Sequence, residues 1–151
     1  MKWTVQSGVS FREIECLLAM VAWTLGLVGI VAVSRSTWVL VGKKRASGFP
    51  SGQEHGPEWY QRINRMHANA VENLAPFAAL VLIGQIVARA EPLFERACVI
   101  FIASRIVQGL AHAISAKSDL VVTVRFTFFI IQYFCMIGLL IAILWAHLAV
   151  I

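Results

Sequence analysis

The stretch Gln61-Arg-Ile-Asn-Arg-Met-His-Ala-Asn-Ala-Val-Glu-Asn-Leu-Ala-Pro-Phe77 opens a segment that is otherwise apolar through Val87. It is too polar for an ordinary membrane span. Crossing a bilayer core takes about 20 helical residues, so a span ending at Val87 begins near Ala68 and carries Glu72 and two asparagines into the hydrocarbon. Charged groups there cost roughly 2.5–3.5 kcal/mol each at mid-bilayer. A chain keeps such groups when they face a polar site or a partner helix, so we place the functional site here.

The composition is that of an integral membrane protein. The 151 residues are 59% hydrophobic and 14% charged, with a mean hydropathy of +0.75, whereas soluble domains are about 45–50% apolar and about 25% charged. The net charge of +5 would also suit a nucleic-acid-binding protein. Because the basic residues flank apolar spans, membrane orientation and lipid headgroups explain most of them, and we expect no nucleic-acid partner. The cysteines have no metal-ligand spacing, so we expect no metal site.

Apolar runs between breakers predict an all-α, integral membrane four-helix bundle in a single domain, residues 1–151. The helices are expected at about 14–41, 58–88, 93–114 and 120–149. Basic residues cluster around the first and third connections: Lys43, Lys44, Arg45, Arg62, Arg65, Lys117 and Arg125. Fewer lie at the N-terminus and the second connection: Lys2, Arg12, Arg89 and Arg96. The positive-inside rule then places the richer side in the cytoplasm and both termini outside.

Polar side chains recur at helical spacing on the second and third expected helices. One face of the second helix carries Arg62, Arg65, Asn69 and Glu72, and one face of the third carries Arg105, Gln108 and His112. Because these helices are antiparallel, Glu72 and Arg105 both lie roughly 15 Å from the cytoplasmic end. We predict a buried ion pair between them. Removing either partner alone would leave an uncompensated charge and cost about 3–5 kcal/mol of stability. It either locks the helices in register or belongs to a site, and Asn69 and Gln108 are open to the same two interpretations.

Positive charge exceeds negative charge in the cytoplasmic third of the helices. No matching set of helical carboxylates accompanies Arg62, Arg65, His112 and Arg125. Such an excess of cationic donors predicts an anionic ligand. For the 43–45 loop cluster alone, we favour orientation of the chain and contact with lipid headgroups. His67 lies off the polar face and is expected to hydrogen-bond to a neighbouring helix.

A resemblance follows from these residues. The second helix reads Arg65-x-His67-x-Asn69-x-x-Glu72-Asn73-x-x-Pro76-Phe77, the third carries Arg105, and the fourth opens with Arg125. Together with four short spans, this pattern resembles the membrane-associated proteins in eicosanoid and glutathione metabolism (MAPEG) over nearly the whole chain, and most of all a bacterial branch. The resemblance implies a homotrimer in a bacterial inner membrane, with glutathione held between neighbouring subunits at the cytoplasmic side.

The resemblance also implies roles for individual residues. Arg125 matches the fourth-helix arginine that faces the thiol in family enzymes, and is the implied catalytic residue. The implied glutathione-binding residues are Arg62, Arg65, His67, Asn69, Glu72, Arg105, Gln108 and His112. Two departures stand out. His112 occupies a position where several catalytic members carry tyrosine, and Phe126 follows Arg125 where one branch has an assisting hydroxyl.

The implied function is that of a glutathione-dependent transferase or peroxidase. The guanidinium of Arg125 would lower the pKa of the glutathione thiol from about 8.5. The thiolate would attack a small lipophilic substrate arriving from the bilayer past Phe126, Phe128 and Phe129. The alternative is a non-catalytic lipid- or ligand-binding scaffold, because the family also contains such members. A small transporter subunit is disfavoured, since no inverted repeat is visible.

Overall fold

The computed structural model describes residues 11–50, 55–87, 92–114 and 118–149, without the side chain of residue 11. These residues form four long helices: α1 (Phe11–Leu40), α2 (Glu58–Val87), α3 (Pro92–Ala113) and α4 (Asp119–Leu148). A single short 3-10 helix, η1 (Ala46–Gly48), follows α1. The all-helical class with four helices is confirmed, and each observed bound lies within three residues of the expected one. Lys2, Arg89 and Lys117, which entered the orientation argument, lie outside the described residues.

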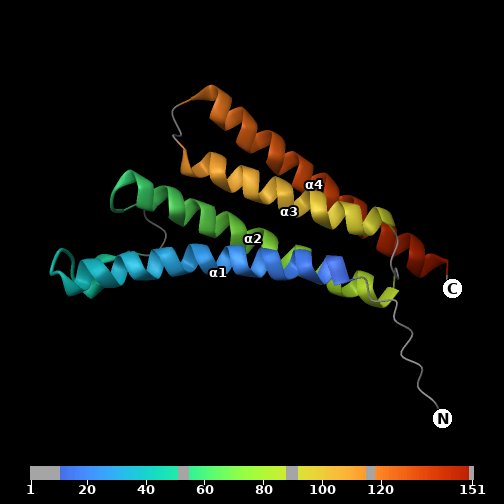
Figure 1. Cartoon of the computed structure of the whole chain (residues 1–151), viewed down its shortest axis with the longest axis horizontal. Coiled ribbons are helices and arrows are strands. Elements are labelled where there is room, and N and C mark those ends of the chain that lie inside the picture. The colour runs from blue at the N-terminus through green and yellow to red at the C-terminus, as the bar shows by residue number, and fades with distance from the viewer. Residues whose placement is uncertain (1–10, 51–54, 88–91, 115–117, 150–151) are drawn as a thin grey trace, which may run out of the picture.

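The helices run alternately up and down as two hairpins (Figure 1). Helix α1 packs on α2 and α3 packs on α4, while α2 and α3 each contact all three other helices. The end of α1, the start of α2, the end of α3 and the start of α4 therefore lie together, at the left of Figure 1. We call this the basic end, because the cationic residues discussed below gather there.

The buried core takes residues from all four helices. The rings of Phe77 and Phe101 stack at 4.0 Å between centroids, with 7° between their planes. Pro76 precedes this stack inside α2 without ending the helix. Nearer the opposite end, Gly84 of α2 lies against the ring of Phe94, and a Cβ at this glycine would collide with that ring. A residue without a side chain is needed there for the two helices to approach.

The chain is a multi-pass integral membrane protein. Among the described helices, α1, α2 and α4 are long and apolar enough to cross a membrane. Helix α3, expected as a fourth span, does not reach the same apolarity because it carries Glu95, Arg96, Arg105, Gln108 and His112 within 22 residues. Helix α3 runs antiparallel between α2 and α4 (Figure 1). Of its polar side chains, Arg105 and Gln108 are buried in the bundle, whereas Arg96 is exposed.

Candidate functional site

A buried guanidinium is the centre of the polar interior. Arg105 in α3 is only 3% exposed. Its Nη1 donates hydrogen bonds to three side-chain amide oxygens: 2.7 Å to Asn69 Oδ1, 2.9 Å to Gln108 Oε1 and 3.2 Å to Gln132 Oε1. These acceptors come from α2, α3 and α4, so one cation joins three helices. Hydrogen bonds to a charged group are the stronger kind and satisfy a donor that would otherwise be costly to bury.

The amides of this cluster also bond to one another. Gln132 donates from Nε2 to Gln108 Oε1 at 3.1 Å and to the carbonyl of Phe128 at 2.8 Å. Gln108 in turn donates to the carbonyl of Arg125 at 3.3 Å. On the α2 side, Asn73 donates to Oδ1 of Asn69 at 3.0 Å. The result is a connected hydrogen-bond network that fixes the rotamers around Arg105 and ends at the backbone of Arg125.

The predicted ion pair between Glu72 and Arg105 is wrong. Glu72 is exposed on the surface of α2, and the ion pairs formed among the described residues do not include it. Its charge still acts on Arg105 electrostatically, but the guanidinium is held by neutral amides. The reason is angular: Asn69 points from α2 into the bundle towards α3, whereas Glu72, three residues later, points outwards.

The structure brings most of the predicted cations together near the basic end. His112 lies within electrostatic range of Arg125, Arg105 and Arg65, which come from three different helices. Arg125 is half-buried. Its Nε is fully buried with no hydrogen-bond partner in the described part of the chain. Arg65 is exposed at the start of α2. Positive charge thus converges on one region, as the sequence indicated.

Arg62 and His67 are placed differently from the rest. Arg62 pairs with Glu58, four residues earlier on α2, at 3.4 Å. That contact reduces the predicted charge excess by one, although the Nε of Arg62 is also buried without a partner. His67 is half-buried, and within the described residues no hydrogen bond joins it to a neighbouring helix as we had expected. Both residues still lie within three residues of Arg65 along α2.

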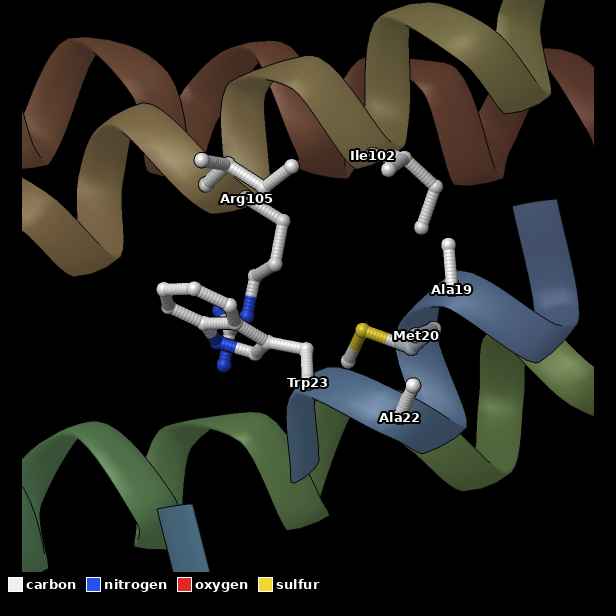
Figure 2. A pocket seen from close by; sticks show the side chains of 7 residues that line it. Ala19, Met20, Ala22, Trp23, Ile102 and Arg105 are labelled. Carbon is white, nitrogen blue, oxygen red and sulfur yellow. The ribbon is translucent and has the colours of Figure 1, made fainter. Parts of the chain in front are cut away.

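A groove beside the network opens between α1 and α3. It has a volume of about 380 Å³ and is lined by Ala19, Met20, Ala22, Trp23, Ile102, Arg105 and Ile106. Figure 2 shows the side chain of Arg105 reaching from α3 past the Trp23 ring on α1. Gly109 of α3 lets the Trp23 ring approach this closely, since a Cβ at Gly109 would collide with that ring. An apolar cavity therefore adjoins the aliphatic stem of the buried cation.

A family model matches residues 14–145. The chain belongs to the MAPEG family. Membership covers most of the sequence and all four helices, and it indicates a function of the membrane glutathione transferase or eicosanoid type. None of the curated proteins matches the chain in sequence. In this MAPEG protein, no group of three or more potential metal ligands occurs among the described residues.

Sequence reasoning missed Gln132 and Trp23. Gln132 is 1% exposed and completes the acceptor set of Arg105, yet it stands alone in a 30-residue apolar helix. A single glutamine gives no periodic pattern. Gln132 could have been found from energetics, because an unpaired amide in the middle of a membrane helix is unfavourable and needs a hydrogen-bond partner. Arg105 and Gln108 were the polar residues at a similar depth. Trp23 gave no signal, because tryptophan is common in membrane helices.

Proposed function

We propose that this MAPEG protein is a membrane-bound glutathione transferase or peroxidase that activates the glutathione thiol at Arg125. The observation that carries the proposal is the buried Nε of Arg125, which has no acceptor among the described residues. Buried donors in native proteins are nearly always paired. A guanidinium left with a free donor beside two further cations therefore calls for an anionic acceptor, and a thiolate or carboxylate meets that need.

The other residues then divide by charge and position. Arg62 and Arg65, on successive turns of α2, are suited to the two carboxylates of glutathione, with His67 beside them. The network of Asn69, Gln108 and Arg105 holds the floor of the site, and we assign it to binding and positioning. The half-buried ring of His112 lies within electrostatic range of Arg125, Arg105 and Arg65, and we assign it to the same binding site. Glu72 is available to the α-ammonium group, as a carboxylate near an excess of arginines.

The chemistry needs only the thiolate. Glutathione ionises near pH 8.5, so little thiolate exists at neutral pH. A nearby guanidinium that lowers this pKa by about two units supplies about 2.7 kcal/mol, plausible for one partly desolvated cation. The sulfur then forms a bond to an electrophilic carbon as the leaving group departs with its electron pair. With a hydroperoxide, the sulfur bonds to the terminal oxygen as the O–O bond breaks, and the leaving alkoxide takes up the proton that the thiol released and becomes an alcohol. A second glutathione then converts the sulfenic acid to disulfide and water.

Lipophilic substrates concentrate in the bilayer and can approach the basic end from the side. Phe126 is 63% exposed and Phe129 is 39% exposed on α4, while Phe128 is half-buried. The aromatic side chains at the start of α4 thus face outwards next to Arg125. The groove between α1 and α3 (Figure 2), with a volume of about 380 Å³, offers a second apolar site.

Assembly as a homotrimer completes the proposal. Glu72 lies well inside a membrane-spanning helix and yet is exposed on the single chain. A charged group facing hydrocarbon at that depth costs roughly 2.5–3.5 kcal/mol. A neighbouring subunit and a polar ligand between subunits would remove that cost. The positive-inside rule favours the cytoplasmic side of the membrane for the basic end and the outside for the start of α1. The resemblance to a bacterial branch of the family favours a bacterial inner membrane.

Purified protein assayed with glutathione and either an aryl halide or a lipid hydroperoxide tests the proposal. Arg125→Gln should lower kcat/KM by about 10²–10³, the usual effect of removing one donor that stabilises developing negative charge. The matched control is Arg96→Gln, which removes an exposed arginine at the other end of α3 and should leave turnover unchanged. Turnover that survives Arg125→Gln undiminished would remove Arg125 from the mechanism.

The scaffold alternative has a distinct signature. Phe126 supplies no hydroxyl next to Arg125, so glutathione or a lipid could bind without ionisation of the thiol. Difference absorbance of the bound thiolate near neutral pH separates the two functions. Glutathione that binds with no thiolate absorbance and no turnover would assign the protein to the binding members of the family.

A further inference from the structure

A second cationic site lies at the end of α1, away from Arg105 and Arg125. An open pocket of about 600 Å³ is lined by Arg35, Ser36, Val39, Leu40, Ala46 and Phe49. It lies where α1 ends and the chain turns through η1, which is the level at which a membrane helix meets the headgroups. None of its lining residues belongs to the proposed glutathione site.

Two cations border one aromatic ring in this pocket. The guanidinium of Arg35 lies 5.4 Å from the centroid of Phe49, and Nζ of Lys44 lies 5.4 Å from the same centroid. Lys44 is also 5.9 Å from the ring of Trp38, which stacks on Phe49 with centroids 6.2 Å apart. Cation–π contacts of this kind hold a charge in place without neutralising it.

No carboxylate balances either cation within the described part of the chain. Arg35 donates from Nε to the hydroxyl of Tyr60 at 2.5 Å, and the ion pairs Arg12–Glu95 and Arg62–Glu58 include neither Arg35 nor Lys44. Tyr60 is fully buried and packs edge-on against Trp38 at 4.8 Å. Among the described residues, aromatic groups therefore hold the two positive charges in place and no carboxylate pairs with them.

The remaining lining is apolar and faces outwards. Leu40 is 85% exposed and Val39 is 37% exposed, so the pocket joins a polar floor to a surface suited to an acyl chain. Trp38 and Trp59 lie edge-on at 6.0 Å, and tryptophans at this level are typical of the membrane interface. A free phosphate would use the cations but not the apolar rim. A phospholipid would use both.

We propose that this pocket binds the headgroup of an anionic phospholipid, with the phosphate between Arg35 and Lys44 and the glycerol and acyl region along Val39 and Leu40. The hydroxyl of Ser36 is available as a further donor to the phosphate. The site differs from a diffuse basic surface because only some of the neighbouring lysines contribute. Lys44 is held over the aromatic rings, whereas Lys43 is exposed.

The experiment uses the purified full-length protein in neutral detergent and phosphatidylglycerol with dibrominated acyl chains, which quench nearby tryptophans. Dibrominated phosphatidylcholine of the same chain length measures quenching that needs no headgroup charge. We expect phosphatidylglycerol to quench at a several-fold lower concentration. Lys44→Gln should weaken its binding about fivefold, the contribution of one basic residue at an anionic membrane surface.

Lys43→Gln is the matched control, because it removes the same charge from the adjacent position and should leave the affinity unchanged. Arg35→Lys should retain most of the preference, and it tests the site without removing its charge. Equal quenching by the two lipids, or equal losses in Lys43→Gln and Lys44→Gln, would overturn the proposal. Displacement of the lipid by millimolar inorganic phosphate would instead identify a free-phosphate site, and the phospholipid assignment would then be wrong.

Discussion

Arg105 reaches from α3 to α2 and donates a 2.7 Å hydrogen bond to Asn69 Oδ1 rather than pairing with a carboxylate. The difference matters for function. Amide dipoles solvate a buried cation without cancelling its charge, so its field persists in the surrounding low-dielectric interior. His112 lies within reach of that field and of the fields of Arg125 and Arg65. The network thus stabilises the bundle and keeps the basic end positive at the same time.

The first prediction compares the stability of two α2 variants. Asn69→Ala removes an acceptor of a buried charged donor and should lower the free energy of unfolding by about 1.5–3 kcal/mol. Glu72→Gln alters an exposed side chain that makes no direct ion pair with Arg105 and should cost less than about 1 kcal/mol in the separated subunit. Chemical unfolding in detergent micelles, followed by helical circular dichroism, measures both. If Glu72→Gln lowered the free energy of unfolding more than Asn69→Ala, the result would support the Glu72–Arg105 ion pair that the sequence suggested.

The second prediction concerns the pH dependence of turnover. In the proposed mechanism, the positive charge of Arg125 stabilises the thiolate and lowers the pKa of bound glutathione, so activity should rise through about pH 6.5, two units below the free thiol. Arg125→Gln removes that stabilisation, so the rising limb should move towards about pH 8.5. The readout is kcat at saturating glutathione across this range, with Arg96→Gln as the control. A change in KM alone, with the profile unmoved, would limit Arg125 to binding.

The third prediction tests the close approach of α2 and α3. Gly84→Ala places a methyl group inside the buried ring of Phe94, which is 3% exposed. Overpacking of this kind typically costs about 1–3 kcal/mol. Gly26→Ala in α1 is the matched control, because the added Cβ meets no atom within 4 Å beyond the neighbouring backbone of its own helix. Thermal unfolding in detergent should therefore show a lower midpoint for Gly84→Ala, and an unchanged or higher one for Gly26→Ala. Equal midpoints would mean that the ring of Phe94 moves aside freely.

The sequence was sufficient for the helices but not for the partners of the buried charge. Apolar runs broken by the 42–57 loop and by Pro92 located all four helices, because hydrophobic periodicity and breakers act locally. The shared depth of the α2 and α3 polar groups also predicted correctly that Arg105 would be buried. Depth does not specify which side chain of a turn points inwards, however. Asn69 and Glu72 are three residues apart, and only the rotation of α2 about its axis decides between them.

Contacts between apolar residues of different helices could not be predicted from the sequence either. Gly84 and Gly109 lie in helices where a lone glycine indicates nothing specific, and their function depends on Phe94 and Trp23 from other helices. The aromatic cluster around Phe49 likewise requires the loop after α1 to return onto Trp38. Such contacts come from how the helices pack, and no local pattern encodes them. The glutathione-binding roles remain predictions of the family resemblance joined to the convergence of charge.

The fourth prediction concerns a buried carboxylate at the end opposite the basic one. Glu13 of α1 is 1% exposed and accepts a 2.6 Å hydrogen bond from Nε2 of Gln85 in α2. Removing one partner of a buried polar pair leaves the other unsatisfied, whereas converting the carboxylate to an amide keeps an acceptor and removes the cost of burying charge. We therefore expect Gln85→Leu to destabilise the protein by about 1.5–3 kcal/mol and Glu13→Gln to be neutral or stabilising. Unfolding in detergent at neutral pH checks both variants. A Glu13→Gln protein less stable than Gln85→Leu would show that the charge of Glu13, and not its hydrogen bond, holds α1 against α2.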